Sequence, residues 1–252
     1  MLSKSQIKLY KSLEKKKFRN ETLLFVAEGT KTVNEFIENN WEIEALIATE
    51  EWAKKYSKKS INKLIITHYE EIQKLSFQKT PQEVIAIIRQ KEYKKINPLN
   101  KLGIALDNIQ DSGNVGTIIR TALWFGLDYL FFGNGTADIF SPKVVQASMG
   151  AIAKIAFNKG DLASFLSSSD TNTTIYGTFM EGDNVFQTKL KQNGILIMGN
   201  EGNGISPTIE RFINKRLYIP PFPNQKAPID SLNVATAAAI ICAEFRRNNF
   251  FI

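Results

Sequence analysis

The sequence is poor in the residues that build disulfides and metal sites, with one cysteine, Cys242, and one histidine, His68, among 252 residues. A single cysteine excludes an internal disulfide, and these two residues cannot complete an ordinary His/Cys zinc site. We interpret Cys242, in an apolar helical run, as a small buried hydrophobe. We interpret His68, just before Tyr69-Glu70-Glu71, as a surface residue at a helix start rather than a catalyst. We expect no metal.

Long hydrophobic runs are also missing. No run approaches the roughly 18 apolar residues that a membrane-spanning helix needs. The first residues, Met1 to Gln6, lack the apolar core of a signal peptide. Together with the scarcity of cysteine, this makes a cytoplasmic protein without a membrane partner the expectation.

Positive charge is concentrated at one end of the chain. The first 20 residues hold 7 basic and 1 acidic side chains, whereas residues 98–252 are nearly balanced at 13 to 12. The spacing of Lys4, Lys8, Lys11 and Lys15 places several lysines on one face of a helix. This pattern fits either a face that binds a polyanion or a solvated lysine-rich helix, and charge alone does not separate the two. The candidate RNA contacts here are Lys8, Lys11, Lys15 and Arg19.

Alternating helical and extended patterns run along the whole chain and predict an α/β fold. Residues 1–95 form a small α/β unit, with strands expected near 22–27, 43–48, 64–67 and 84–89. A polar, proline-containing segment around 91–100 is typical of a linker. Residues 96–252 form a second unit, with strands expected at 102–106, 129–132, 154–157, 174–179, 195–198 and 216–219. Helices are expected between these strands, and a long one from Leu232 to Asn248 ends the chain.

Three polar segments of the second unit each follow an expected strand. They are Asp111-Ser-Gly-Asn114-Val-Gly116-Thr-Ile-Ile-Arg120, Gly199-Asn200-Glu201-Gly202-Asn-Gly204, and Ser231-Leu232-Asn233-Val234. Parallel α/β sheets bind ligands at the carboxyl ends of their strands, so these segments are site candidates. Taken singly, each has a simpler explanation: a tight glycine turn, a solvated Glu201, or Ser231 as an N-cap. None matches the dinucleotide or P-loop fingerprint.

Taken together, and with Ile219-Pro220, these segments resemble the three motifs of the SpoU (TrmH-like) branch of the SPOUT methyltransferases. These enzymes methylate the 2′-hydroxyl of RNA ribose. The resemblance covers roughly residues 100–247. The first 95 residues are similar, more loosely, to the family's substrate-binding domain, which resembles ribosomal protein L30e. Phe25-Val-Ala-Glu28-Gly29 and Thr80-Pro81-Gln82 carry that second likeness.

The resemblance implies a fold, a cofactor and partners. The fold is a parallel α/β sheet whose C-terminal part threads into a deep trefoil knot, beside an L30e-like α/β domain. The cofactor is S-adenosylmethionine, the substrate is RNA, and the protein is a homodimer. The residues that the resemblance assigns to the cofactor are Thr178, Phe179, Gly199, Asn200, Gly204, Ile219 and Leu232. One departure is the loop 221–230, which has three prolines and no glycine, so we expect a stiffer pocket rim.

The resemblance also assigns catalytic roles. Arg120 is central, either as a base for the 2′-hydroxyl or as a clamp on the neighbouring phosphate; a guanidinium is essentially never neutral, which weighs against the first role. Asn114 and Asn233 orient the ribose or Arg120, and Glu201 positions Arg120 or a ligand amine. Ser231 bonds near the hydroxyl. An appended domain is more typical of enzymes that act on 23S ribosomal RNA. A tRNA enzyme, an inactive RNA-binding protein on this fold and a methyltransferase for another substrate are the alternatives.

Overall fold

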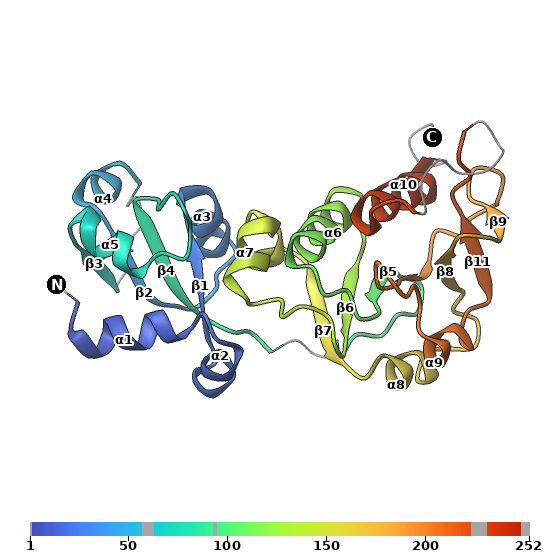
Figure 1. Ribbon diagram of the computed structural model, residues 1–252, viewed down its shortest axis with the longest axis horizontal. Helices are drawn as coiled ribbons and strands as arrows, with labels where there is room; N and C mark the ends of the chain where they lie inside the picture. The colour runs from blue at the N-terminus through green and yellow to red at the C-terminus, as the bar shows by residue number, and fades with distance from the viewer. Residues whose placement is uncertain (1, 57–62, 93–94, 223–230, 248–252) are drawn as a thin grey trace. The chain divides into compact units, whose positions relative to one another are not determined.

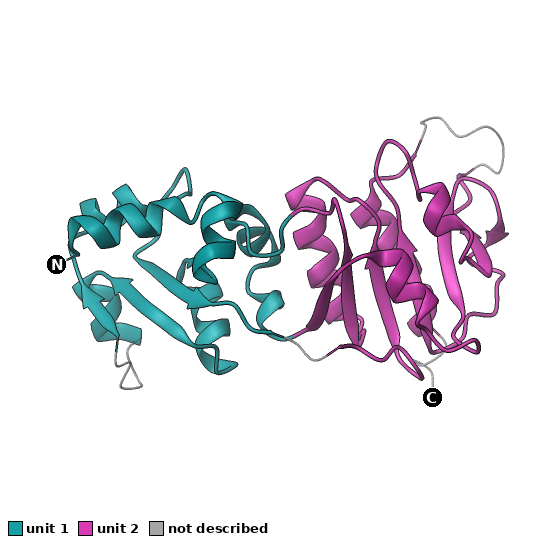
Figure 2. Cartoon of the chain, turned by 90° about the horizontal axis from the view of Figure 1, so that it is seen from below, with its two compact units in different colours: residues 1–92, 138–154 teal, residues 93–137, 155–252 magenta. Residues whose placement is uncertain are grey.

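The computed structural model describes residues 2–56, 63–92, 95–222 and 231–247 (Figure 1). The chain divides into two compact units (Figure 2). Unit 1 comprises residues 1–92 and 138–154, and unit 2 comprises residues 93–137 and 155–252. The first change of unit falls between residues 92 and 93, and residues 138–154, which the sequence pattern placed in the second unit, group with unit 1.

Unit 1 is built on a four-stranded mixed sheet. Its central strand β4 runs antiparallel to both β1 and β2, and β3 pairs with β2 in parallel. Apolar residues on these strands form the core of the unit, with Ile47, Ile85 and Ile87 fully or almost fully buried. The strands and the helices that connect them are β1 (Leu24–Glu28), α3 (Thr30–Glu38), β2 (Ile43–Ala48), α4 (Glu50–Tyr56), β3 (Leu64–Ile66), α5 (Tyr69–Leu75) and β4 (Val84–Arg89).

The basic N-terminal segment forms two helices, α1 (Lys4–Ser12) and α2 (Lys16–Thr22), rather than the single helix that the lysine spacing suggested. Ser3 caps α1 through a capping box with Gln6. The break follows from Arg19, whose Nη1 donates to the carbonyl oxygens of Leu13 and Glu14, both at 2.7 Å. Those carbonyls are satisfied from outside the helix, so the chain turns there.

Residues 138–154 complete unit 1 with α7 (Pro142–Ser148) and a 3-10 turn, η1 (Ala151–Ala153). The ring of Phe140 packs in an aromatic group with Phe25, Phe36 and Trp41. The indole of Trp41 donates to the carbonyl of Ala153 at 3.1 Å, and Lys154 pairs with Glu35 at 2.6 Å. The strand expected at 154–157 accordingly begins only at Ala156, because Lys154 ends the turn and is held by Glu35.

Unit 2 contains a seven-stranded sheet in which every pairing is parallel. Figure 1 shows helices α6 and α10 on one side of this sheet and α8 and α9 on the other. The helices are α6 (Ser112–Trp124), α8 (Leu162–Ser167), α9 (Pro207–Glu210) and α10 (Val234–Arg247). In sheet order the strands are β7 (Ala156–Gly160), β6 (Tyr129–Gly133), β5 (Leu102–Leu106), β10 (Gly194–Met198), β8 (Ile175–Phe179), β11 (Lys215–Tyr218) and β9 (Asp183–Asn184).

The strand order creates the position of the site. From β5 the chain adds β6 and β7 outward on one side, and it later returns to place β10 on the other side of β5. The connections leaving β5 and β10 therefore run to opposite sides, which is the arrangement beside which parallel α/β sheets bind ligands. The first two polar segments named above follow β5 and β10.

The two scarce residues lie as interpreted. Cys242 is buried in α10, and burial raises the pKa of its thiol to about 12. His68 is exposed and occupies the N-cap position of α5. No helix among the described residues is long and apolar enough to cross a membrane.

Candidate active site

Hydrogen bonds join three of the five predicted catalytic side chains, although they come from distant parts of the sequence. The amide nitrogen Nδ2 of Asn114 donates to Oε1 of Glu201 at 2.8 Å. The Nδ2 of Asn233 donates to Oδ1 of Asn114 at 2.9 Å. The network therefore links the start of α6, the loop after β10 and the start of α10.

Each member of this network is fixed by its own element. Asn114 lies in the first turn of α6, which Asp111 caps by accepting from the Asn114 backbone N–H at 2.7 Å. Asn233 caps α10, because its Oδ1 accepts from the N–H groups of Ala235 and Thr236. The N-cap role considered for Ser231 thus belongs to Asn233, and α10 begins at Val234 rather than at Leu232.

The loop that carries Glu201 is held in a compact form. Asn200 and Gly204 exchange two backbone hydrogen bonds of 2.9 Å. The Asn200 side chain donates to the carbonyl of Asn108 at 2.8 Å and accepts from the N–H groups of Gly202 and Asn203. A Cβ at Gly199 would lie 2.4 Å from the backbone of Gly204, so this close approach requires glycine. The loop behaves as a fixed support for the Glu201 carboxylate.

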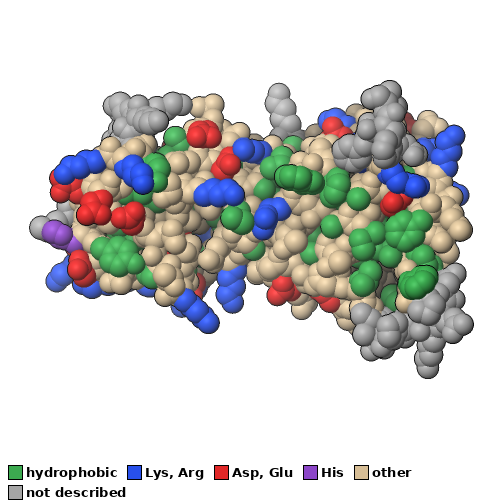
Figure 3. Space-filling view, turned by 90° about the horizontal axis from the view of Figure 1, so that it is seen from above, with side chains coloured by type: hydrophobic (Ala, Val, Ile, Leu, Met, Phe, Trp, Pro, Cys, Tyr) green, Lys and Arg blue, Asp and Glu red, His purple; other side chains and the backbone are tan. Residues whose placement is uncertain are grey.

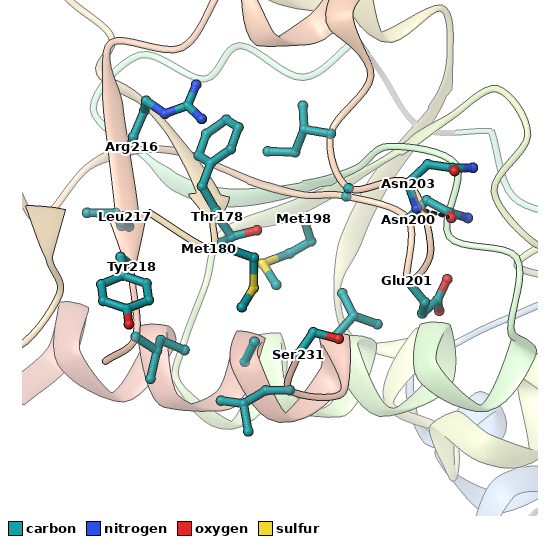
Figure 4. Close-up of a pocket in the computed structure, with 18 of the residues that line it drawn as sticks. Thr178, Met180, Met198, Asn200, Glu201, Asn203, Arg216, Leu217, Tyr218 and Ser231 are labelled. Atoms are coloured by element: carbon teal, nitrogen blue, oxygen red, sulfur yellow. Dashed lines mark hydrogen bonds between the residues drawn. The ribbon is translucent and has the colours of Figure 1, made fainter. Parts of the chain in front are cut away.

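A pocket of about 870 Å³ opens beside the network. All seven residues predicted to bind the cofactor line it, and so do Glu201 and Ser231. Its apolar walls include Met198, Leu217 and Ile241. Figure 4 shows Glu201 and Ser231 toward one end of the pocket and Arg216 and Tyr218 toward the other. The volume lies in the range of roughly 300–1,000 Å³ that small-molecule and cofactor sites occupy.

The charges that line the described part of the pocket are mostly negative. They comprise the carboxylates of Glu181, Glu201 and Glu210 and one basic group, Arg216. Arg216 is paired with Glu210, and its guanidinium lies 3.5 Å from the centre of the Phe179 ring. Arg216 is thereby partly neutralised, and two carboxylates remain to face a ligand. This lining favours a ligand with an apolar body and net positive charge.

Arg120 stands apart from the network. It is exposed on α6, six residues after Asn114, and no described residue forms a hydrogen bond or an ion pair with its guanidinium. It does not line the pocket. Its charge is therefore available to a partner outside the described chain, such as an anionic substrate.

The predicted RNA contacts of unit 1 divide into two kinds. Lys8, Lys11 and Lys15 are exposed, and the Lys11 ammonium lies 5.4 Å from the centre of the Phe77 ring. Arg19 is only 2% exposed, and its guanidinium donates to Asp138 at 2.6 and 3.0 Å. We therefore correct the prediction for Arg19: its side chain is committed inside unit 1 and cannot contact RNA in this structure.

Sequence reasoning missed two supporting residues of the site. Asp107, buried at the end of β5, accepts from the Ser206 N–H at 2.7 Å and so ties this strand end to the segment after the Glu201 loop. Arg216 forms part of the far end of the pocket. The only sequence signal for Asp107 was a charged residue directly after an apolar strand. Arg216 gave no signal, because the Phe179 ring under its guanidinium comes from a different strand.

Comparison with known proteins decides the family. Residues 101–243 match the SpoU rRNA Methylase family, and residues 4–86 match the MRM3-like substrate binding domain. The chain belongs to the SpoU family. The two matches fall on either side of the expected linker. Among the described residues, no cluster of three His, Cys, Asp or Glu side chains could hold a metal ion.

Relatives of this SpoU chain match it over nearly its full length. The *Bacillus subtilis* 23S rRNA (guanosine(2553)-2′-O)-methyltransferase RlmP is 28% identical, over 96% of each chain. A putative RNA methyltransferase of the TrmH family from *Porphyromonas gingivalis* has a TM-score of 0.89 and 36% identity, covering 98% of this chain and 99% of that one. An AdoMet-bound rRNA methyltransferase from *Sinorhizobium meliloti* has a TM-score of 0.86 and 28% identity, covering 98% and 97%.

Residues 223–230, most of the proline-containing loop, lie outside the described residues, as does Asn248. The stiffer rim expected for that loop therefore stays a prediction. Pro221 and Phe222, which precede it, are described, and Phe222 is 95% exposed.

Proposed function

We propose that this SpoU protein transfers a methyl group from S-adenosylmethionine to a ribose 2′-hydroxyl of 23S ribosomal RNA. The observation that carries the proposal is the Asn114–Glu201–Asn233 network, which lies beside a pocket of cofactor size. Similarity to RlmP and to the AdoMet-bound *S. meliloti* enzyme supports the reaction and the cofactor.

The pocket suits this cofactor. S-adenosylmethionine supplies a methyl group that is already activated, and it carries a sulfonium and an ammonium against one carboxylate. Its net positive charge matches a lining in which carboxylates outnumber basic groups. The glycines of the 199–204 loop allow close backbone approach, and Met198, Leu217 and Ile241 offer apolar walls.

In this proposal the residues of the chain align the sulfonium methyl group with the 2′-hydroxyl and accept the proton that the hydroxyl loses. Alignment of reacting atoms can contribute about 7–11 kcal/mol in favourable cases. Ser231 and Glu201, which both line the pocket, would bond near the hydroxyl. The exposed guanidinium of Arg120 is suited to bidentate binding of a phosphate next to the target ribose.

The homodimer implied by the family likeness is part of the proposal. Helices α6 and α10 pack together, and Arg246 of α10 donates to the carbonyls of Phe125 and Gly126 at 2.8 and 2.7 Å. Trp124, directly before these carbonyls, is 84% exposed, and the partly exposed Ile240 lies on α10. Figure 3 shows hydrophobic side chains gathered on the visible face of unit 2. A second copy that covers α6 and α10 would bury such side chains.

We also propose the trefoil knot, a cytoplasmic location and an RNA-binding role for unit 1. Supporting the knot, β10 lies between β5 and β8, and the chain after β11 returns to place Asn233 against Asn114. The exposed lysines Lys8, Lys11 and Lys15 support RNA binding by unit 1.

The test is transfer of labelled methyl from S-adenosylmethionine to ribosomal RNA and, in a separate reaction, to tRNA, each followed by nuclease digestion. Label recovered as a 2′-O-methylnucleotide in 23S rRNA is the expected result. Label recovered only with tRNA would favour the alternative substrate, and cofactor binding without any RNA labelling would contradict the proposal.

Arg120→Ala and Arg120→Lys refine this test. We expect Arg120→Ala to slow single-turnover transfer about 10²-fold or more, since it removes a charge-assisted contact to the substrate next to the reacting ribose. Arg120→Lys should recover only part of the rate, because a lysine keeps the charge but not the planar fork. Wild-type rates in both variants would exclude Arg120 from the reaction.

A further inference from the structure

The hydrogen-bond network has a fixed direction. The Oδ1 of Asn233 accepts from two backbone N–H groups at the start of α10, at 3.0 and 3.2 Å, so its Nδ2 is the atom left to face Asn114. Asn114 must then present Oδ1 to Asn233 and Nδ2 to Glu201. The cap of α10 thus sets the orientation of both amides.

This direction makes Glu201 an acceptor. Its Oε1 receives a hydrogen from the Asn114 amide, which suits an ionised carboxylate. No lysine or arginine of the described chain lies within 4 Å of it, and its Oε2 has no hydrogen-bond partner there. A carboxylate whose task was to position Arg120 would form an ion pair with it, and none is present.

Other groups near the network do not take the same role. Asp111, the cap of α6, accepts from the Asn114 backbone N–H and, unlike Glu201, does not line the pocket. Ser231 is a hydroxyl that can donate or accept, but it is too weak a base to hold the proton. Arg120 lies on α6, six residues after Asn114. Its guanidinium stays fully protonated, so it cannot accept the proton of the hydroxyl.

We propose that Oε2 of Glu201 accepts the proton of the ribose 2′-hydroxyl, with Asn114 and Asn233 as positioning residues. This inference rests on the proposed function. As the 2′-oxygen forms its bond to the methyl carbon, the S–CH₃ bond breaks and its electron pair stays on sulfur, which gives S-adenosylhomocysteine. The proton passes to the carboxylate and then to solvent, since Glu201 is exposed.

The first experiment separates this role from cofactor binding. Glu201→Gln keeps an oxygen for the Asn114 amide but cannot hold the proton. We expect single-turnover transfer at saturating S-adenosylmethionine to fall about 10²–10⁴-fold, the usual contribution of general acid–base catalysis. The Kd for the cofactor, measured by calorimetry, should stay within about threefold of wild type. Asp170→Asn, which removes another exposed carboxylate of unit 2 away from the pocket, is the matched control.

The second experiment restores the base from outside. Formate or acetate added to Glu201→Gly should recover transfer in proportion to the carboxylate concentration, and the stronger base should rescue more at equal access. An unchanged rate in Glu201→Gln, or a raised cofactor Kd with a normal rate at saturation, would overturn the inference. Absence of transfer by the wild-type protein would instead contradict the proposed function.

Discussion

Glu28, at the end of β1, is a buried carboxylate that forms no ion pair with another described residue. It is 8% exposed, and it accepts from the Phe77 N–H at 2.8 Å and from the Ser76 hydroxyl. Burial raises the pKa of Glu28 above its ordinary value of 4.5, because the charged form loses its hydration. The two hydrogen bonds and the positive charge of Lys11 offset this only in part. Its hydrogen bonds hold Ser76 and Phe77, the residues after α5, against the end of β1, although burial destabilises the charged form of the carboxylate.

The raised pKa predicts how the stability of unit 1 depends on pH. The folded form holds the Glu28 proton to higher pH than the unfolded form, so this group makes unit 1 less stable as pH rises through 4.5 toward the folded pKa. Glu28→Gln should still accept the hydrogen bond from the Phe77 N–H, and it should remove the fall in stability with rising pH because glutamine does not ionise. We expect hydrogen exchange in β1 and β4 to be slower in the variant at pH 7, with no difference below pH 4. Faster exchange at pH 7 would contradict the prediction.

Among the elements, the segment 138–154 depends on one buried ion pair. The side chains of Arg19 and Asp138 are 3% and 13% exposed, and their nitrogen and oxygen lie 2.6 Å apart. Removing one partner of a buried pair leaves an uncompensated charge and costs about 3–5 kcal/mol. The pair therefore joins α2 to the segment that leads into α7.

Asp138→Asn should lower the free energy of unfolding of unit 1 by about 3 kcal/mol or more, since Arg19 would keep its buried charge. Glu21→Gln is the control, because it breaks the exposed pair with Lys17 and should cost less than about 1 kcal/mol. Hydrogen exchange of β1 amides reports on unit 1 separately from unit 2. Equal protection in the two variants would show that the pair contributes no stability.

Local patterns in the sequence predicted most elements, and the misses have identifiable causes. Strands such as 43–48, 84–89 and 102–106 begin and end where their apolar runs do. The two-residue strand β9 has no such run, and the break between α1 and α2 depends on Arg19 reaching back to the chain. Arg19 looked like part of a basic surface because its partner, Asp138, is 119 residues away.

The candidate site was predictable in its residues but not in its connections. Motif resemblance placed Asn114, Glu201 and Asn233 in one site, and the structure joins them. The direction of the hydrogen bonds could not be predicted, because it depends on Asn233 rather than Ser231 capping α10. A shift of two residues in a helix start decides which amide atom faces the network.

At the scale of the whole molecule, the face of unit 2 formed by α6 and α10 exposes apolar side chains, and we propose that a second copy of the chain covers it. A tryptophan that is 84% exposed is costly in water, and the partly exposed Ile240 is on the neighbouring helix α10. Arg120 lies one turn before Trp124 on α6, at the spacing that places two side chains on the same helix face. A second copy that covers Trp124 would therefore lie close to Arg120.

Trp124→Glu and Ile240→Glu should therefore weaken the dimer. Central aromatic contacts of an interface contribute 2 kcal/mol or more, which corresponds to at least about 30-fold in dissociation constant. Sedimentation velocity over a range of concentrations would measure the change, and far-UV circular dichroism would verify that the variants are folded. Leu99→Glu, the same kind of change at another exposed apolar residue of unit 2, should leave the wild-type dimer intact. If neither Trp124→Glu nor Ile240→Glu changes the dissociation constant of the dimer, the interface lies elsewhere. If the wild-type protein is a monomer, the proposed homodimer is wrong.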